Sequence, residues 1–235
     1  ISLGLVGSEM CIRDSYTSGF VIENYSGQFP INDIKLDRGE SYVIALELKD
    51  VNTSTPLDAI ERNRDGLIGT LIQSDKDIVV NSGSSNGSFG NGGARDYGID
   101  QIVDVSRVGK EYILVRGDGN DGWENILVVG HEDGTEINIY GSSNSTQTID
   151  SGEYYLIEGN LFSNDGNMYI STNKDVFVYQ GTGGGSEANQ EMFFVPPISC
   201  GSRGDVNNIP FIDELGTKIF NGAVSIVSRK DDTVE

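Results

Sequence analysis

Histidine, cysteine and proline are scarce in this sequence, and long hydrophobic runs are missing from it. The 235 residues include one His, two Cys and five Pro. One histidine and two cysteines leave too few ligands for an ordinary zinc site. The longest uninterrupted apolar runs have only about four to six residues, whereas a helix that crosses a bilayer needs about 20. This fragment is accordingly not expected to insert into a membrane.

Basic residues are also few. Lys and Arg together number 16 against 36 Asp and Glu, which gives a formal net charge of −20. Such a charge repels the phosphate backbone of nucleic acids and anionic membrane surfaces, so neither is an expected partner. Cations are the natural counter-charge. No cofactor is expected, except that calcium is considered below.

The first fifteen residues, ISLGLVGSEMCIRDS, differ in character from the rest of the chain. They resemble translated adapter sequence at the end of an assembled read, and they make a poor signal peptide because no basic region precedes their short apolar stretch. We predict that residues 1–15 are an assembly artefact and no part of the fold, with a genuine strand as the alternative. Cys11 lies in this segment, which leaves Cys200 either buried or paired with a cysteine beyond residue 235.

Alternation of apolar and polar residues with period two recurs along the chain and predicts an all-β fold. The expected strands lie at 42–48, 78–81, 112–116, 126–130, 136–140, 154–157, 168–171 and 176–180. Asp133 and Gly134 predict a hairpin between two of them. The segments at 75–77 and 173–175 predict tight turns in which Asp and Asn side chains bond to their own backbone. Only residues 56–64 suggest a helix.

The chain also resembles itself at an offset of roughly 100 residues. LDRGESYVIALE at 36–47 matches IDSGEYYLIEG at 149–159, SDKDIVVNSGS at 74–84 matches TNKDVFVYQGTG at 172–183, and ENILVVGHEDGTE at 124–136 matches NGAVSIVSRKDDTVE at 221–235. We predict tandem antiparallel β-sandwich-like modules of about 100 residues, with a β-propeller-like arrangement as the alternative. The expected modules are residues 16–104, truncated at the N-terminus, residues 105–200, complete, and residues 201–235, the start of a further copy.

Five segments carry a resemblance to a known family. They are GTLIQSDKDIVVNSGS at 69–84, DGTEINIYG at 133–141, SGEYYLIE at 151–158, NKDVFVYQG at 173–181 and FFVPPISC at 193–200. In order and spacing they resemble the IgGFc-binding protein N-terminal domain family, in the version found in large secreted bacterial surface proteins associated with gliding motility. The resemblance implies a non-catalytic adhesion or binding module, extracellular or at the cell surface, with the ligand open. We expect a glycan or glycoprotein partner.

One acidic loop offers a candidate metal site. Asp118, Asn120, Asp121 and Glu124 supply hard oxygen ligands of the kind that calcium prefers. Their order departs from an EF-hand because Gly122 stands where Asp or Asn is expected, and an acidic turn without an ion is the alternative. The loop also contains G-x-G-x-x-G, but a strand follows it, not the helix that a dinucleotide site requires.

Ligand binding is expected on loops, which carry function on many β scaffolds. Two segments rich in Gly, Ser and Asn, at 81–93 and 181–190, follow strands that match each other in the repeat. Aromatic side chains there and nearby could stack on sugars if they are exposed. The candidates are Phe89, Tyr97, Trp123 and Phe162.

No catalytic centre is expected. His131 is the only histidine, and neither H-E-x-x-H nor G-x-S-x-G occurs. Carboxylate pairs of the glycosidase kind arise by chance among 36 acidic residues. The tripeptide Arg203-Gly204-Asp205 matches the integrin-binding motif, which also arises by chance. A binding module is therefore predicted, with a structural stalk and a polysaccharide-active enzyme as the alternatives.

Overall fold

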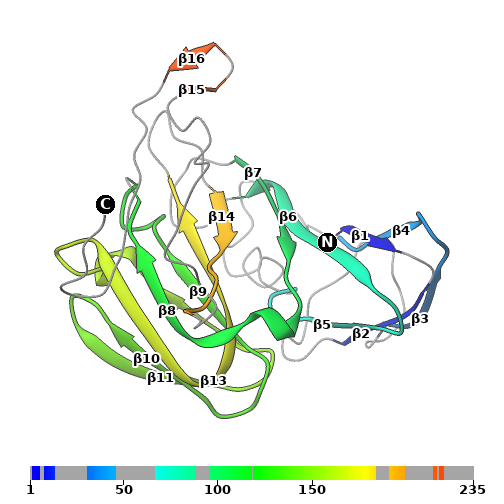
Figure 1. Ribbon diagram of the computed structural model, residues 1–235, viewed down its shortest axis with the longest axis horizontal. Helices are drawn as coiled ribbons and strands as arrows, with labels where there is room; N and C mark the ends of the chain where they lie inside the picture. The colour runs from blue at the N-terminus through cyan, green and yellow to red at the C-terminus, as the bar shows by residue number, and fades with distance from the viewer. Residues whose placement is uncertain are drawn as a thin grey trace, which may run out of the picture. The chain divides into compact units, whose positions relative to one another are not determined.

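The computed structural model describes residues 2–5, 8–13, 31–45, 67–87, 96–117, 119–183, 191–198, 214–215 and 217–219. The helix expected at 56–64, Cys200 and the tripeptide at 203–205 lie outside these ranges. The chain forms two compact units, Ile1–Pro197 and Ile198–Glu235. Apart from two single-turn 3-10 helices, the regular elements of the described residues are strands with antiparallel pairing, which confirms the all-β prediction (Figure 1).

The largest sheet of the first unit has seven strands. Their order is β11-β10-β13-β9-β12, and β14 and β8 also pair with β13. The strands are β8 (Gly109–Val115), β9 (Ile126–Gly130), β10 (Thr135–Tyr140), β11 (Asn144–Ile149), β12 (Tyr154–Ile157), β13 (Asn167–Thr182) and β14 (Glu191–Phe194). The predicted strands at 126–130 and 154–157 agree with β9 and β12 to the residue.

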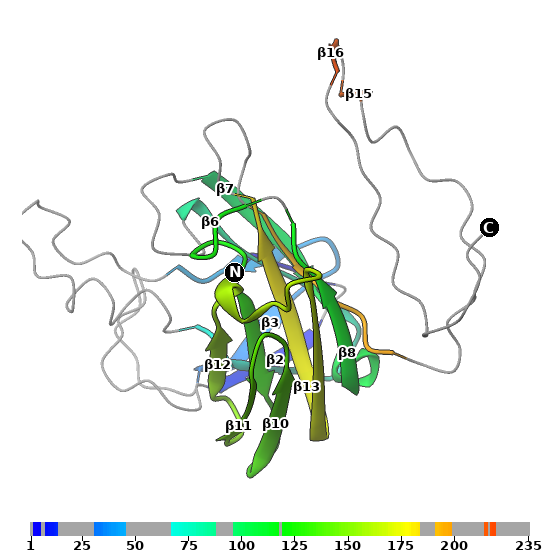
Figure 2. The ribbon, with the colours of Figure 1, turned by 90° about the vertical axis from the view of Figure 1, so that its left-hand side faces the viewer.

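Strand β13 runs through the whole sheet and changes partners along its length (Figures 1 and 2). Its first half pairs with β10 and its second half with β9, and the register to β8 shifts between Ser171 and Val176. The turn expected at 173–175 is therefore wrong as a break between strands, because such an irregularity bends one strand without ending it. The predicted hairpin is also wrong. Gly134, at a φ of 66°, lies in the turn that joins β9 to β10, but these two strands pair with different halves of β13 and not with each other.

The core lies on the inner side of this sheet and receives side chains from both halves of β13. Burial alternates residue by residue, as in β9, where the first, third and fifth residues are buried. Each fully buried aliphatic side chain contributes about 1.5–3 kcal/mol relative to an exposed one. The core residues include Tyr112, Leu114, Ile126, Val128, Ile137, Ile139, Ile157, Phe162, Met168, Ile170, Val176 and Val178.

Two smaller sheets complete the first unit, in the orders β4-β1-β6-β7 and β3-β2-β5. Their strands are β1 (Ser2–Leu5), β2 (Ser8–Arg13), β3 (Ile31–Leu36), β4 (Ser41–Val43), β5 (Leu71–Ser74), β6 (Ile78–Gly87) and β7 (Asp96–Ile102). Residues 2–5 and 8–13 thus pair with strands of the following chain. Their assignment to an assembly artefact stays a prediction, which the natural gene sequence upstream of Tyr16 tests. In the second unit, β15 (Glu214–Leu215) pairs with β16 (Lys218–Ile219).

Two segments that match in the repeat form the same turn. Glu40 N donates to Asp37 O at 3.0 Å and Glu153 N donates to Asp150 O at 3.0 Å. In both, the glutamate side chain accepts from the aspartate N–H at 2.8 Å. The glycine between them has a φ of 87° in the first turn and 79° in the second, a region that favours glycine. The module boundaries at 104 and 200 stay a prediction.

The S-D-K-D and T-N-K-D segments share a local hydrogen bond as well. Ser74 Oγ donates to Lys76 O at 2.6 Å, and Thr172 Oγ1 donates to Lys174 O at 2.5 Å. In each segment, the bond to the nearby backbone is therefore made by the hydroxyl residue that precedes the predicted turn at 75–77 or 173–175. Asn173 instead accepts, through Oδ1, from Glu136 N on β10 at 2.8 Å.

Candidate functional site

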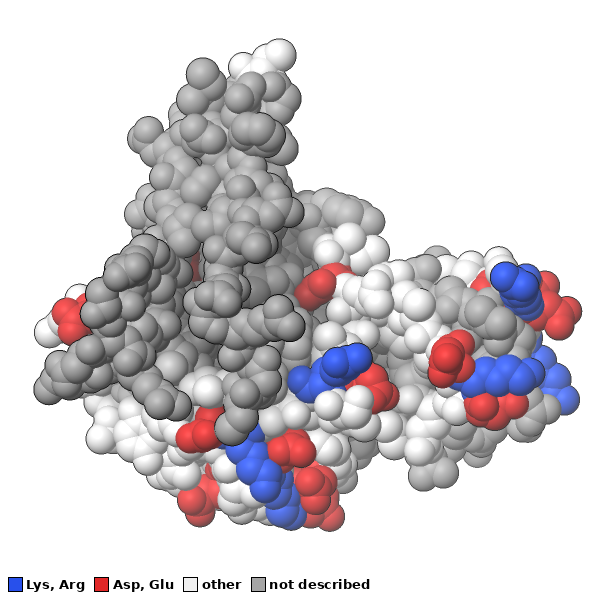
Figure 3. Space-filling model, viewed as in Figure 1, with Lys and Arg blue, Asp and Glu red and all other residues white. Residues whose placement is uncertain are grey.

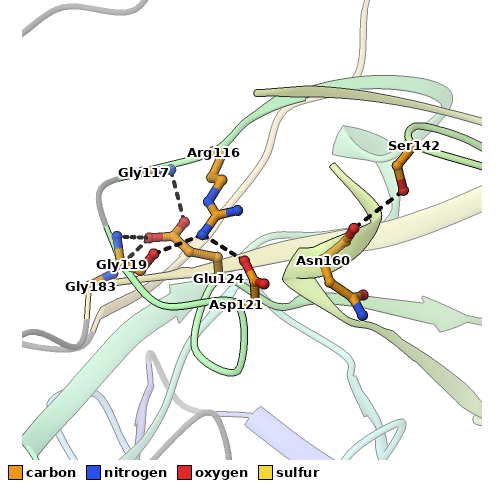
Figure 4. A network of polar contacts seen from close by, with 8 residues as sticks. All are labelled: Arg116, Gly117, Gly119, Asp121, Glu124, Ser142, Asn160 and Gly183. Carbon is orange, nitrogen blue, oxygen red and sulfur yellow. Dashed lines mark hydrogen bonds and ion pairs between the residues drawn. The ribbon is translucent and has the colours of Figure 1, made fainter. Parts of the chain in front are cut away.

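The acidic loop singled out in the sequence joins β8 to β9, close to the point where β13 ends. Its central side chain is Glu124, which is 0% exposed. Glu124 Oε2 accepts a hydrogen bond from Gly117 N at 2.8 Å, and Oε1 accepts from Gly119 N at 2.8 Å and Gly183 N at 3.3 Å (Figure 4). A buried carboxylate is tolerated when its oxygens are bonded in this way. Glu124 therefore fastens the loop to the end of β13.

Other polar groups of the loop bond to one another. Arg116 Nη2 lies 2.6 Å from Asp121 Oδ1 and also donates to Gly119 O at 3.0 Å. Trp123 N and Glu124 N both donate to the carbonyl of Asn120, which closes a turn. The Arg116 guanidinium thus supplies the positive charge next to Asp121, while backbone amides surround Glu124.

These contacts bear on the calcium prediction. Glu124 is engaged by three amides, Asp121 is paired with Arg116, and Asp118 lies outside the described residues. Within the described part of the chain, no group of three or more His, Cys, Asp or Glu side chains is placed to hold a metal ion. The calcium site stays a prediction, and binding there would compete with the bonds just described.

Thermal melting in EDTA and in millimolar calcium tests this site. A ligand at 100 times its Kd adds about 2.7 kcal/mol of stability, which raises Tm by roughly 5–10 °C in a domain of this size. Because the loop satisfies two of the four side chains internally, we expect Tm to change by less than about 1 °C. A calcium-dependent rise of several degrees that Asp118→Asn abolishes would establish the site.

The four aromatic candidates differ in where the structure places them. Trp123 is half-buried in the acidic loop, and Phe162, at 4% exposure, belongs to the core, so its proposed stacking role is wrong. Tyr97 lies in β7 with its side chain outside the description, and Phe89 lies outside the described residues. The segment at 81–93 was expected to be a loop, but its first seven residues continue β6.

His131 directly follows Gly130, the last residue of β9, at the polar end of that strand. Its ring meets Phe177 edge to face at 6.0 Å, and its carbonyl accepts from Ser151 Oγ at 3.0 Å. Neither contact supplies a nucleophile or an acid–base partner. The expectation of no catalytic centre stays a prediction.

A surface that loop-centred reasoning missed lies on the side of the largest sheet opposite the core. It is formed by β11, β10, the first half of β13 and β8, of which β10, β13 and β8 lie side by side in Figure 2. We call it the outer face. Its side chains include Asn144, Thr146, Thr148, Glu136, Asn138, Tyr140, Tyr169, Ser171, Glu111 and Ile113.

An apolar stripe crosses the strands of the outer face. Tyr140 is the register partner of Tyr169, which is the partner of Ile113. The two tyrosine rings stack with centroids 5.6 Å apart and planes at 29°. Tyr140 is 43% exposed and Ile113 is 38% exposed. The stripe therefore presents aromatic and aliphatic surface to solvent on rigid strands.

Polar side chains beside the stripe are held by hydrogen bonds. Thr146 Oγ1 donates to Asn138 Oδ1 at 2.8 Å, and Asn138 Nδ2 donates to Glu136 Oε1 at 3.2 Å. The Tyr169 hydroxyl donates to Glu111 Oε1 at 2.5 Å. This last bond raises the pKa of Tyr169, because losing the phenol proton would break it. These polar side chains offer hydroxyl, amide and carboxylate groups in fixed positions.

The sequence did contain a signal for this surface. In β10 the buried Ile137 and Ile139 alternate with outward residues, so Tyr140 had to point away from the core. Tyr169 likewise stands between the buried Met168 and Ile170. What periodicity does not give is the register that places the two rings together.

Charges on the described surface are interspersed. In the view of Figure 3, Lys and Arg side chains lie next to Asp and Glu side chains and form no separate basic patch. No helix in the described ranges is long and apolar enough to cross a membrane.

Comparison with known families identifies the chain. The family model described as IgGFc binding protein matches residues 15–235. Neither a comparison with curated proteins nor one with solved structures gives a match. The family match spans most of the chain and agrees with the resemblance carried by the five segments. A family of binding domains indicates an extracellular binding module. The chain therefore belongs to the IgGFc-binding protein family.

Proposed function

We propose that this chain is an adhesion or binding module of a secreted bacterial surface protein, and that its outer face binds a glycan, free or on a glycoprotein. The observation that carries the proposal is the exposed, stacked pair Tyr140 and Tyr169 beside a row of ordered polar side chains. No catalytic role is proposed.

The chemistry of the outer face suits sugars. A pyranose ring has an apolar face of C–H groups and a rim of hydroxyls, and an exposed tyrosine offers an apolar ring with a polar edge. Amide and hydroxyl side chains such as Asn138 and Thr146 both donate and accept hydrogen bonds. Because existing bonds hold these side chains, less conformational entropy is lost on binding.

The position of these side chains on strands also supports the proposal. Sites built on strands keep their geometry better than sites on loops. The outer face rests on the largest sheet of the described residues, directly above core residues such as Ile139 and Ile170, which are 1% and 0% exposed. A rigid platform favours a binding role over that of a plain spacer.

Binding to a panel of immobilised polysaccharides, mucins and immunoglobulin Fc tests the proposal. We expect Tyr140→Ala to weaken binding of the full chain at least about tenfold, or about 1.4 kcal/mol, because central aromatic residues dominate binding energy. Leu156→Ala is the matched control, since Leu156 is 41% exposed on β12, away from the outer face. We expect it to leave the Kd unchanged.

The outcomes separate the rival functions. Absence of binding to the whole panel by the unaltered chain would favour a structural stalk. Binding to Fc alone would replace the glycan with a protein ligand. Release of reducing sugar from a panel polysaccharide would support an enzyme.

A further inference from the structure

We infer that the outer face prefers glycans with free amino groups and rejects glycans with sulfate or carboxylate groups. The inference rests on the proposed function and specifies the ligand class of the same surface. It follows from the charges that border the apolar stripe of Tyr140, Tyr169 and Ile113.

The charged side chains of the outer face are all carboxylates. Glu111 lies on β8 at the position after Lys110, and Glu136 lies on β10. By strand alternation Lys110 lies on the opposite side of β8, and Lys174 Nζ donates to the carbonyl of Asp133, in the turn before β10. Among the side chains that define the outer face, the charged ones are therefore two carboxylates and no cation.

Both carboxylates are fixed in place. Glu111 accepts the Tyr169 hydroxyl and Glu136 accepts the Asn138 amide, each through Oε1. A sugar ring that stacks on Tyr140 therefore lies next to Tyr169 and the Glu111 carboxylate bonded to it, and an oligosaccharide that extends along β10 reaches Glu136, four residues away. At physiological salt, charges within about 8 Å still interact appreciably. Ammonium groups are attracted at this range, and sulfates or carboxylates are repelled.

The charge of the whole chain acts in the same direction. With a formal net charge of −20, the protein slows the approach of polyanions and favours polycations. This long-range contribution depends on salt but not on which carboxylate is present. The local contribution depends on Glu111 and Glu136, so substitution can separate the two.

Three forms of one sugar backbone test the inference: chitosan oligosaccharides with free amines, chitin oligosaccharides with acetylated amines, and sulfated chitosan. Titrations of the full chain in about 20 mM salt should give a Kd at least about fivefold lower for chitosan than for chitin, and no binding of the sulfated form. In about 200 mM salt the difference should shrink.

A double substitution, Glu111→Gln with Glu136→Gln, should abolish most of the preference and retain chitin binding, because glutamine keeps the accepting oxygen. The control is Glu132→Gln with Glu158→Gln, which changes the net charge equally at two exposed sites off the outer face. This control should keep the preference.

The possible failures are distinguishable. Equal or tighter binding of sulfated chitosan, or no binding of chitosan while another panel glycan binds, overturns the inference. A preference that survives the outer-face double substitution also overturns it. Absence of binding to every glycan overturns the proposed function itself.

Discussion

Replacing Tyr112 with alanine is expected to lower the free energy of unfolding by about 3–5 kcal/mol, the range for truncating a buried large aromatic residue. Tyr112 is 0% exposed and belongs to the core of the largest sheet. Its hydroxyl donates to Val176 O at 2.5 Å and accepts from Gly109 N at 2.9 Å. These are the two residues at which β8 and β13 resume pairing after the irregularity. The side chain therefore fills the core and joins the strands where their register changes.

Tyr112→Phe separates these two roles. The ring stays and the hydroxyl goes, so we expect a smaller loss, about 1–3 kcal/mol, the cost of leaving buried polar groups unpaired. Urea unfolding of both variants measures the difference. Tyr140→Ala serves as the control, because this exposed side chain should lose little more than its stacking on Tyr169, about 0.5–1.5 kcal/mol. If Tyr112→Ala and Tyr140→Ala proved equally mild, the assignment of Tyr112 to the core would be wrong.

The loss of stability at alkaline pH provides a second test of Tyr112→Phe. Burial raises the pKa of Tyr112 to about 12, because the phenolate is poorly solvated in the core. The unfolded chain loses this proton near pH 10. A raised pKa in the folded state means that stability is complete below about pH 10 and falls as the pH rises toward 12. Burial also raises the pKa of Tyr179 to about 12, so Tyr112→Phe should reduce the fall without removing it.

Local pattern was sufficient to predict strands but not their partners. The short apolar run ILVV in ILVVG placed β9 to the residue, because such a run between polar and turn residues is typical of a largely buried strand. The turn at Asp133 and Gly134 is also real, yet the strands that flank it pair with different halves of β13. Pairing between distant segments depends on how the core closes, and no short window records that.

In the candidate site, too, the local sequence predicted some features, whereas others depend on contacts between distant segments. Acidic residues in a loop predicted a solvated or ion-binding turn, since carboxylates are rarely buried unless bonded. Glu124 is buried because glycine amides from two distant segments converge on it, and that convergence requires the folded sheet. Conversely, Tyr140 was recoverable from alternation alone, but its stacking on Tyr169 was not.

Substituting Glu124 gives the second large effect. We expect Glu124→Gln to cost about 1.5–3 kcal/mol, the contribution of hydrogen bonds that involve a charged group. Glutamine has nearly the same shape but replaces one accepting oxygen with an NH₂ group. That group faces N–H donors of Gly117, Gly119 or Gly183, so at least one amide loses its acceptor. Chemical unfolding measures the loss.

Asp121→Asn is the control for this loop. Asp121 is 55% exposed, and its ion pair with Arg116 is open to solvent, so we expect a loss of only about 0.2–1 kcal/mol. Hydrogen exchange supplies the local readout. Protection of the Gly117, Gly119 and Gly183 amides should fall in Glu124→Gln and persist in Asp121→Asn. If both variants lost equal stability, the amide contacts of Glu124 would not be what holds the loop.

The same variant also locates binding. Glu124 bonds to Gly183, just beyond the end of β13, whereas Tyr140 and Tyr169 face each other at the first half of β13, where its partners are β10 and β8. If the ligand binds the outer face, Glu124→Gln should change loop protection and stability but leave the Kd within about twofold at a temperature where the variant is folded. If the ligand binds the loops, as residues such as Trp123 suggested, the Kd should rise together with the loss of amide protection. Glu124→Gln and Tyr140→Ala should therefore show opposite patterns of stability and affinity, and only a binding site on the outer face predicts that pair of results.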